Sequence, residues 1–295
     1  MTAGERGFLL LTGYLGDPAR KPMTVAQFRE LARRVGFMQK PDFDRDLQTE
    51  DLIKLGYDKA SAEKILMLLS HEVLLDFYME KSRRCGCTPL TRLHSLYPSA
   101  LRKTLGLDAP ACLWAKGDLE LLKYRRISLV GSRDLRPENR AFAQAVGTQA
   151  AEQGYVLVSG NARGADRAAQ DSCLAQGGSV ICVVADQLAK YDLRPNVLYL
   201  SEDGFDLAFS SHRALSRNRI IHALSEKTVV AQCALGAGGT WSGTVKNLHH
   251  SWSSVFCFKD GSNACRSLSQ RGAVPITEQE LHKLFAAQEQ QIKIF

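Results

Sequence analysis

Two kinds of hydrophobic pattern divide this sequence. In residues 1–80 apolar side chains recur every three or four positions, for example from Ala62 through Leu69 to Val73. That spacing places them on one face of a helix. From residue 125 onward, short apolar runs alternate with glycine-containing loops and with segments of helical periodicity. We therefore predict a small N-terminal helical domain followed by an α/β domain.

The second half of the chain repeats the order strand, glycine loop, helix. We predict strands at residues 127–130, 155–159, 180–185, 196–200, 228–231 and 255–258, and helices at 137–153, 165–175, 217–224 and 240–249. The predicted strands are apolar along their whole length, as strands must be when helices cover both faces of a parallel sheet. The fold class that follows is α/β, with a Rossmann-like doubly wound parallel sheet.

Punctuation by proline and glycine suggests the domain boundaries. Residues 1–80 form the helical domain, whose short helices and glycine turns are similar to SAM or helix-hairpin-helix modules, with a plain helical bundle equally open. Residues 81–120 carry several proline turns and are interpreted as a linker or lead-in. The Rossmann-like domain covers 121–276, and 277–295 is predicted as a C-terminal helix or tail.

Composition and charge narrow the class of protein. The 295 residues are 45% hydrophobic and 23% charged, which is ordinary for a globular protein, and the net charge of +7 favours a polyanionic partner. No apolar run reaches the roughly 18 residues of a membrane span, and no signal peptide is evident, so we expect a cytoplasmic protein with no membrane partner.

The eight cysteines are interpreted as buried reduced thiols. Cys182 and Cys257 lie inside apolar runs, and Cys85-Gly86-Cys87 has no second Cys or His pair at ligand spacing. We therefore expect neither a metal nor a cofactor. No nucleophile–base pair or paired carboxylate set accompanies the loops described next, so the sequence does not predict an enzyme.

Four loops follow predicted strands or begin predicted helices, and all carry glycine or arginine. In a parallel sheet such loops gather at the carboxyl edge, where free amides and arginines bind anions. Asp166 is expected to cap its helix or to orient Arg163. The loops contain Gly131-Ser132-Arg133, the segment from Gly160 and Asn161 to Arg163 and Asp166, Arg217-Asn218-Arg219, and Gly238-Gly239-Thr240.

Two familiar nucleotide motifs are missing. The first strand is not followed by Gly-x-Gly-x-x-Gly, and there is no Walker lysine motif, which disfavours ordinary dinucleotide or ATP use. Gly238-Gly239-Thr240 echoes the loop of LOG-type phosphoribohydrolases, but residues 241–248 contain no carboxylate to stabilise a sugar cation. A LOG-type or nucleotide-sensing protein with the same anion pocket remains an alternative.

Taken in order, these motifs resemble the DNA-processing protein A family (DprA, also called Smf). The resemblance covers about residues 95–276 and includes Ser201-Glu202 and Gly261-Ser262-Asn263. It departs from the family at residues 185–196 and at Gly238-Gly239-Thr240-Trp241, and it lacks the C-terminal winged helix that family members often carry. It implies a homodimeric, non-enzymatic mediator that binds single-stranded DNA and loads a RecA-type recombinase on incoming DNA in natural transformation.

The same resemblance implies the DNA-binding residues. Tyr191, Phe205, Phe209 and Trp241 are further candidates for stacking on unpaired bases, with a core position favoured more for Phe205 and Phe209 than for Tyr191. For Arg133 the structural alternative is a surface ion pair with Asp134 or Glu138. The implied DNA-binding residues are Gly131, Ser132, Arg133, Gly160, Asn161, Arg163, Arg217, Asn218, Arg219, Gly239 and Thr240.

Overall fold

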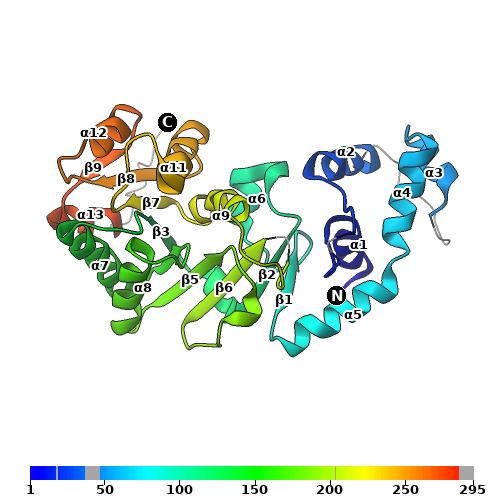
Figure 1. Ribbon diagram of the computed structural model, residues 1–295, viewed down its shortest axis with the longest axis horizontal. Coiled ribbons are helices and arrows are strands. Elements are labelled where there is room, and N and C mark those ends of the chain that lie inside the picture. The colour runs from blue at the N-terminus through cyan, green and yellow to red at the C-terminus, as the bar shows by residue number, and fades with distance from the viewer. Residues whose placement is uncertain (18, 37–46, 203, 286–295) are drawn as a thin grey trace, which may run out of the picture. The chain divides into compact units, whose positions relative to one another are not determined.

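A computed structural model describes residues 1–17, 19–36, 47–202 and 204–285 of the chain (Figure 1). The chain divides into two compact units. The first comprises Met1–Lys116, Asp186–Asp192 and Leu200–Phe209, and the second comprises Gly117–Ala185, Leu193–Tyr199 and Ser210–Phe295. The main chain therefore passes between the units more than once.

The first unit begins with helices. They are α1 (Ala3–Thr12), α2 (Val25–Gly36), α3 (Thr49–Lys54), α4 (Lys59–Leu69) and α5 (Glu72–Arg84). Their apolar faces meet in one core, as the helical spacing predicted, because each helix is apolar on one side only. This core contains Leu11, Met23, Leu31, Leu52, Ala62, Ile65 and Leu68.

The periodic series from Ala62 to Val73 does not form one helix. α4 ends at Leu69, where the Ser70 hydroxyl donates to the Met67 carbonyl oxygen at 2.9 Å, and α5 begins at Glu72. The new helix turns Val73 outward, and its side chain is 74% exposed. The prediction was wrong at this position because a break of two residues changes which face is buried.

Strands also occur in the stretch interpreted as a lead-in, and no strand was predicted there. β1 (Thr88–Thr91) pairs antiparallel with β2 (Cys112–Gly117), and α6 (Ser99–Leu105) and the short η1 (Gly106–Asp108) lie between them in the chain. Trp114 of β2 packs with Phe205 and Tyr78, with ring centroids 5.0 and 5.3 Å away. These three rings form an aromatic core within the first unit.

The second unit contains the predicted doubly wound sheet. From β5 its strands run in the order β5-β4-β3-β7-β8-β9, each parallel to its neighbour, and β6 lies beyond β5. β9 was not predicted, since three residues carry too little pattern. The strands are β3 (Arg126–Val130), β4 (Val156–Ser159), β5 (Ser179–Val184), β6 (Val197–Glu202), β7 (Lys227–Val230), β8 (Ser254–Phe258) and β9 (Val274–Ile276).

Helices cover this sheet, and two of them pack very closely. A Cβ on Gly147 of α7 would lie 2.1 Å from the carbonyl oxygen of Ala169 in α8, so only glycine allows this approach; Figure 1 shows the two helices together in green. The helices are α7 (Pro137–Glu152), α8 (Ala165–Ala175), α9 (Ser211–Ser216), α10 (Asn218–Ala223), α11 (Gly238–His250), α12 (Asn263–Gln270) and α13 (His282–Phe285), with short η2 (Leu119–Lys123), η3 (Leu188–Lys190) and η4 (Glu278–Glu280).

The path of the chain creates a switch point in the sheet. From β3 the chain moves through β4 to β5 on one side, and from β7 it moves through β8 to β9 on the other. β3 and β7 are neighbours, so their carboxyl ends open between the two halves, where doubly wound sheets bind ligands. Of the predicted C-terminal helix or tail, residues 286–295 lie outside the described part of the chain.

Candidate nucleic-acid interface

The loop after β3, residues 131–136, is held against the loop after β7, residues 231–237. The Ser132 amide donates to the Gln232 carbonyl oxygen at 2.9 Å. The Gln232 side chain also accepts from the Arg136 amide at 3.0 Å and donates to the Asp134 carbonyl oxygen at 3.0 Å. Gln232 thus clamps the β3 loop. It was missed because glutamine carries no motif; its place directly beyond the strand at the switch point was the available signal.

The loop after β4, residues 160–164, closes on the β3 loop from the other side. The Ala165 amide donates to the Ser132 carbonyl oxygen at 3.1 Å. A Cβ on Gly164 would lie 2.4 Å from the carbonyl oxygens of Ser132 and Arg133, and its φ of +86° also requires glycine. The β3, β4 and β7 loops therefore meet at the carboxyl edge of the sheet, as their positions in the sequence predicted.

Asp166 organises the β4 loop instead of orienting Arg163. Its buried carboxylate accepts from the amides of Gly160 at 3.0 Å and Ala162 at 3.2 Å. Arg163 pairs with Asp134 at 3.3 Å, with both side chains largely exposed. The expectation that Asp166 orients Arg163 was wrong, because its carboxylate folds back under the loop.

The three residues of the Arg-Asn-Arg motif point to different places. The guanidinium of Arg217 lies against the Cα of Gly160, where an added Cβ would be 1.7 Å from Nη1. The Asn218 side chain donates to the Gly239 carbonyl oxygen at 3.2 Å. Arg219 bends back and donates to the Ser216 carbonyl oxygen at 3.0 Å. The start of α10 therefore joins the β4 loop to the start of α11, with Arg219 turned toward its own segment.

The start of α11 completes the assembly. The Thr240 hydroxyl donates to the Gly131 carbonyl oxygen at 2.9 Å, which connects α11 to the β3 loop. Ala237 precedes the helix and provides no side-chain cap for its first amides. All four predicted loops are thus connected by specific contacts within the second unit.

Many loop amides expected to face a ligand are already bonded within the protein. The amides of Ser132, Gly160 and Ala165 donate to other loops or to Asp166. The Ser132 hydroxyl accepts from the Asp134 amide at 3.3 Å. The prediction of a pocket lined by amides at these positions was wrong, since the loops use those donors to fold against one another. Arginine side chains provide the outward-facing charge.

Arg133 is the clearest outward cation. Its side chain is exposed and has no hydrogen-bond or ion-pair partner in residues 1–285 as far as the structure describes them. Asp134 pairs with Arg163, and Glu138 lies 3.3 Å from Arg136, so neither acid takes Arg133 as the structural alternative proposed. An unpaired arginine at this edge can bind a phosphate without first breaking an internal bond.

The aromatic candidates separate by exposure. Phe205 is completely buried in the aromatic core of the first unit, as expected, and is closed to a ligand. Phe209 is 54% exposed, so its expected core position was wrong. Tyr191 and Trp241 are half-buried. Trp241 follows Thr240 in the first turn of α11, and the guanidinium of Arg271 lies 5.9 Å from its ring centroid.

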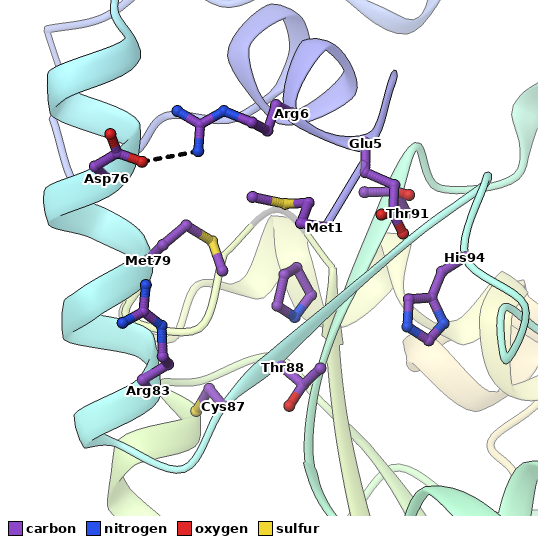
Figure 2. Close-up of a pocket in the computed structure, with 11 residues that line it drawn as sticks. Met1, Glu5, Arg6, Asp76, Met79, Arg83, Cys87, Thr88, Thr91 and His94 are labelled. Carbon is purple, nitrogen blue, oxygen red and sulfur yellow. Dashed lines mark hydrogen bonds and ion pairs between the residues drawn. The ribbon is translucent and has the colours of Figure 1, made fainter. Parts of the chain in front are cut away.

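A cavity in the first unit holds none of the predicted site residues. Figure 2 shows it between α1, α5 and β1, with Arg6 reaching to Asp76. Its volume is about 510 Å³, and Glu5 and His94 also line it. Buried Glu5 caps its own helix by accepting from the Thr2 amide at 2.7 Å. These acids already have partners from their own helices, so this cavity offers no charge matched to an anion.

Metal and membrane features were also sought. Within the described residues, no group of three or more His, Cys, Asp or Glu side chains is placed to hold a metal ion. Among those same residues, no helix has both the length and the apolar character needed to cross a bilayer. Cys182 and Cys257 are buried, as their apolar surroundings predicted, and burial raises the pKa of each thiol to about 12.

The fold and its loops define a Rossmann-like α/β protein with a basic edge at the switch point of its sheet. The chain belongs to the DNA recombination-mediator protein A family, whose model matches residues 88–285. The match includes every predicted site residue.

Curated relatives and solved structures agree with this assignment. The chain is 32% identical over 185 residues to DNA processing protein DprA of Streptococcus pneumoniae, covering 58% of this chain and 64% of the relative. It is 33% identical over 196 residues to the protein of the same name from Bacillus subtilis, covering 62% of this chain and 63% of the relative. The aligned region thus spans under two thirds of either relative.

Two solved structures share the fold. The crystal structure of DNA processing protein A from Streptococcus pneumoniae gives a TM-score of 0.73 at 24% identity, covering 97% of this chain and all of that one. A structure of DNA processing protein A from Helicobacter pylori, described for its single-stranded DNA binding mode, gives 0.57 at 23% identity, covering 68% of this chain and 94% of that one.

Proposed function

We propose that the carboxyl edge of the sheet in the second unit binds the phosphate backbone of single-stranded DNA. The observation that carries this proposal is the exposed, unpartnered Arg133 beside the switch point. Arg163 and Arg217 lie on the adjoining loop contacts. Arginines bind phosphate oxygens through charge-assisted hydrogen bonds, and neutralising phosphates releases counterions, so the interaction is strongest at low salt.

Unpaired bases give the second part of the interaction. Trp241 is half-buried at the start of α11, directly after Thr240, and one face of its ring is available for stacking. Stacking of a base on an aromatic side chain contributes about 1–3 kcal/mol and requires that the base be free of its duplex partner. Single strands therefore bind more tightly than a duplex of equal length.

The cellular role follows from the family. As a recombination mediator, the protein loads a RecA-type recombinase on single strands that enter during natural transformation, and it acts as a homodimer in the cytoplasm without catalysing a reaction. Family membership supports this role, together with the relative from Helicobacter pylori that is described as binding single-stranded DNA. Magnesium-dependent DNA cleavage that copurifies with the chain would contradict the non-enzymatic part.

The test compares labelled single-stranded and double-stranded oligonucleotides of equal length by fluorescence anisotropy at 50 and 200 mM salt. We expect tighter binding of the single strand at both concentrations and a loss of affinity with salt for each. Equal affinities would contradict the proposed site.

Nucleotide binding at the same edge is the second candidate function. The observation that favours it is the start of α11, where Ala237 leaves the first amides without a side-chain cap. Such amides suit a terminal phosphate. Nucleoside monophosphates that displace the oligonucleotide at micromolar concentration, or that release free base on incubation, would favour a nucleotide-sensing or LOG-type protein.

A further inference from the structure

Asp166 is a buried acid in the first turn of α8, directly below the proposed phosphate site. Only 6% of its surface is exposed, and its Oδ2 accepts from two amides of the loop that precedes it, those of Gly160 and Ala162. These bonds turn the β4 loop around the carboxylate. Asp166 therefore determines the shape of one of the loops that form the site.

Hydrogen bonding alone does not explain an acid at this position. Burial raises the pKa of Asp166, while the positive charge of Arg217 and the two amide bonds act in the opposite direction. An asparagine would accept the same two hydrogen bonds without placing a charge away from water. The carboxylate differs from that amide in its charge, and Arg217 is the strongest charged influence on it.

Gly160 provides the space in which Arg217 lies. A Cβ at this position would be 1.7 Å from Nη1 of Arg217 and 2.2 Å from its Cζ. Because the φ of Gly160 is outside the left-handed region, backbone conformation does not require glycine here. What requires glycine is the guanidinium on its Cα. Gly160 and Asp166 together define the position of Arg217.

We propose that Asp166 is the positioning residue of the phosphate site, and that its buried charge, acting with the space left at Gly160, fixes the guanidinium of Arg217 where it contacts single-stranded DNA. The inference rests on the proposed function of this edge. It assigns Asp166 no contact with DNA of its own.

The experiment measures the affinity of the whole chain for a labelled oligothymidylate over a series of salt concentrations, for the wild type, Asp166→Asn, Arg217→Ala and the double variant. We expect Asp166→Asn to weaken binding by about threefold or more and to lower the salt slope by about 0.9, the value for one lost phosphate contact. We expect the double variant to match Arg217→Ala, because a displaced arginine has no contact left to lose.

Other roles for Asp166 give different results. If its charge only repelled phosphate, Asp166→Asn would bind more tightly, which would overturn the inference. If it only stabilised the fold, the melting temperature would fall while affinity and salt slope stayed at wild-type values, which would also overturn it. Additive losses in the double variant would show that the two residues act separately and would have the same consequence.

A second variant covers the case in which Asp166→Asn does not fold. Gly160→Ala leaves the carboxylate intact and displaces Arg217, and we expect the same loss of affinity and slope. Gly7→Ala is the matched control, since an added Cβ there meets nothing within 4 Å. Wild-type binding by folded Gly160→Ala would overturn the inference. A wild-type chain that does not bind single strands would instead contradict the proposed function.

Discussion

The hydroxyl of Thr240 donates a 2.9 Å hydrogen bond to the carbonyl oxygen of Gly131, joining the first turn of α11 to the end of β3. These residues are far apart in the sequence and come from opposite halves of the doubly wound sheet. Their contact spans the switch point, because β3 and β7 are neighbouring strands. This bond holds together the two sides of the proposed DNA site.

Thr240→Val removes this hydroxyl while keeping the side-chain shape. We expect the free energy of unfolding to fall by about 1 kcal/mol, since the Gly131 carbonyl loses its partner, and the affinity for single strands to fall as the loops separate. Denaturant titration and anisotropy measure the two effects. Thr240→Ser keeps the hydroxyl and is the control; equal losses in both variants would show that the hydrogen bond is not responsible.

Arg133→Ala removes the exposed, unpartnered cation of the β3 loop. We expect binding of single strands to weaken roughly three- to tenfold for all sequences, with a salt slope lower by about 0.9. The melting temperature should stay unchanged because the side chain contacts no partner. Adding Arg217→Ala should weaken binding further, if both guanidiniums contact one strand.

The matched control is Lys246→Ala, which removes one positive charge from an exposed position on α11. It should leave the salt slope almost unchanged, since only cations at the sheet edge contact phosphates. If Arg133→Ala binds like the wild type with its fold intact, Arg133 is not a phosphate ligand.

Asp134→Asn tests whether an acid competes with DNA for Arg163. The two side chains form an ion pair of 3.3 Å that is 76% exposed for Arg163 and 88% exposed for Asp134, so the pair itself contributes little to stability. Without it, Arg163 is free to bind phosphate. We therefore expect tighter binding of single strands and a steeper salt dependence.

Glu120→Gln provides the charge-matched comparison, because Glu120 pairs with Lys123 in η2, before β3 begins. Both variants make the net charge more positive by one. Similar gains from both would indicate a general charge effect and would exclude a specific release of Arg163.

His222 makes stability depend on pH. It is fully buried, and burial, assisted by the positive charge of Arg217, lowers its pKa from 6.5 to about 3. Its Nδ1 lies 3.2 Å from Thr228 Oγ1 and 3.1 Å from Asn247 Nδ2. Since the unfolded chain takes up a proton first, the free energy of unfolding should fall as pH drops through 6.5 toward 3, by no more than about 1.4 kcal/mol per pH unit.

Denaturant unfolding of the wild type and His222→Gln at pH 7.5, 6.5 and 5.5 measures this contribution. We expect the wild type to lose more stability than the variant between pH 7.5 and 5.5, because glutamine takes up no proton. Parallel pH profiles would mean that His222 is protonated alike in the folded and unfolded states.

The sequence predicted the sheet well because strands buried on both faces must be apolar along their length. The predicted helix at 165–175 matches α8 (Ala165–Ala175), and the other predicted strands and helices of the second unit lie within a few residues of those observed. β9 was missed because two of its three residues, Val274 and Pro275, are exposed, so no apolar run marks it. The short β1 was missed for a similar reason, because its residues carry little apolar pattern.

What the sequence determined alone is the order of elements and the identity of the loops at the carboxyl edge, since strand direction fixes where those loops emerge. The tertiary structure decided which donors face outward. The Ser132 and Gly160 amides bond inside the protein, Arg219 turns back to Ser216, and Arg133 stays free. That outcome depends on partners distant in the chain, such as Gln232 and Asp166, and local sequence carries no record of which distant group satisfies a given hydrogen bond.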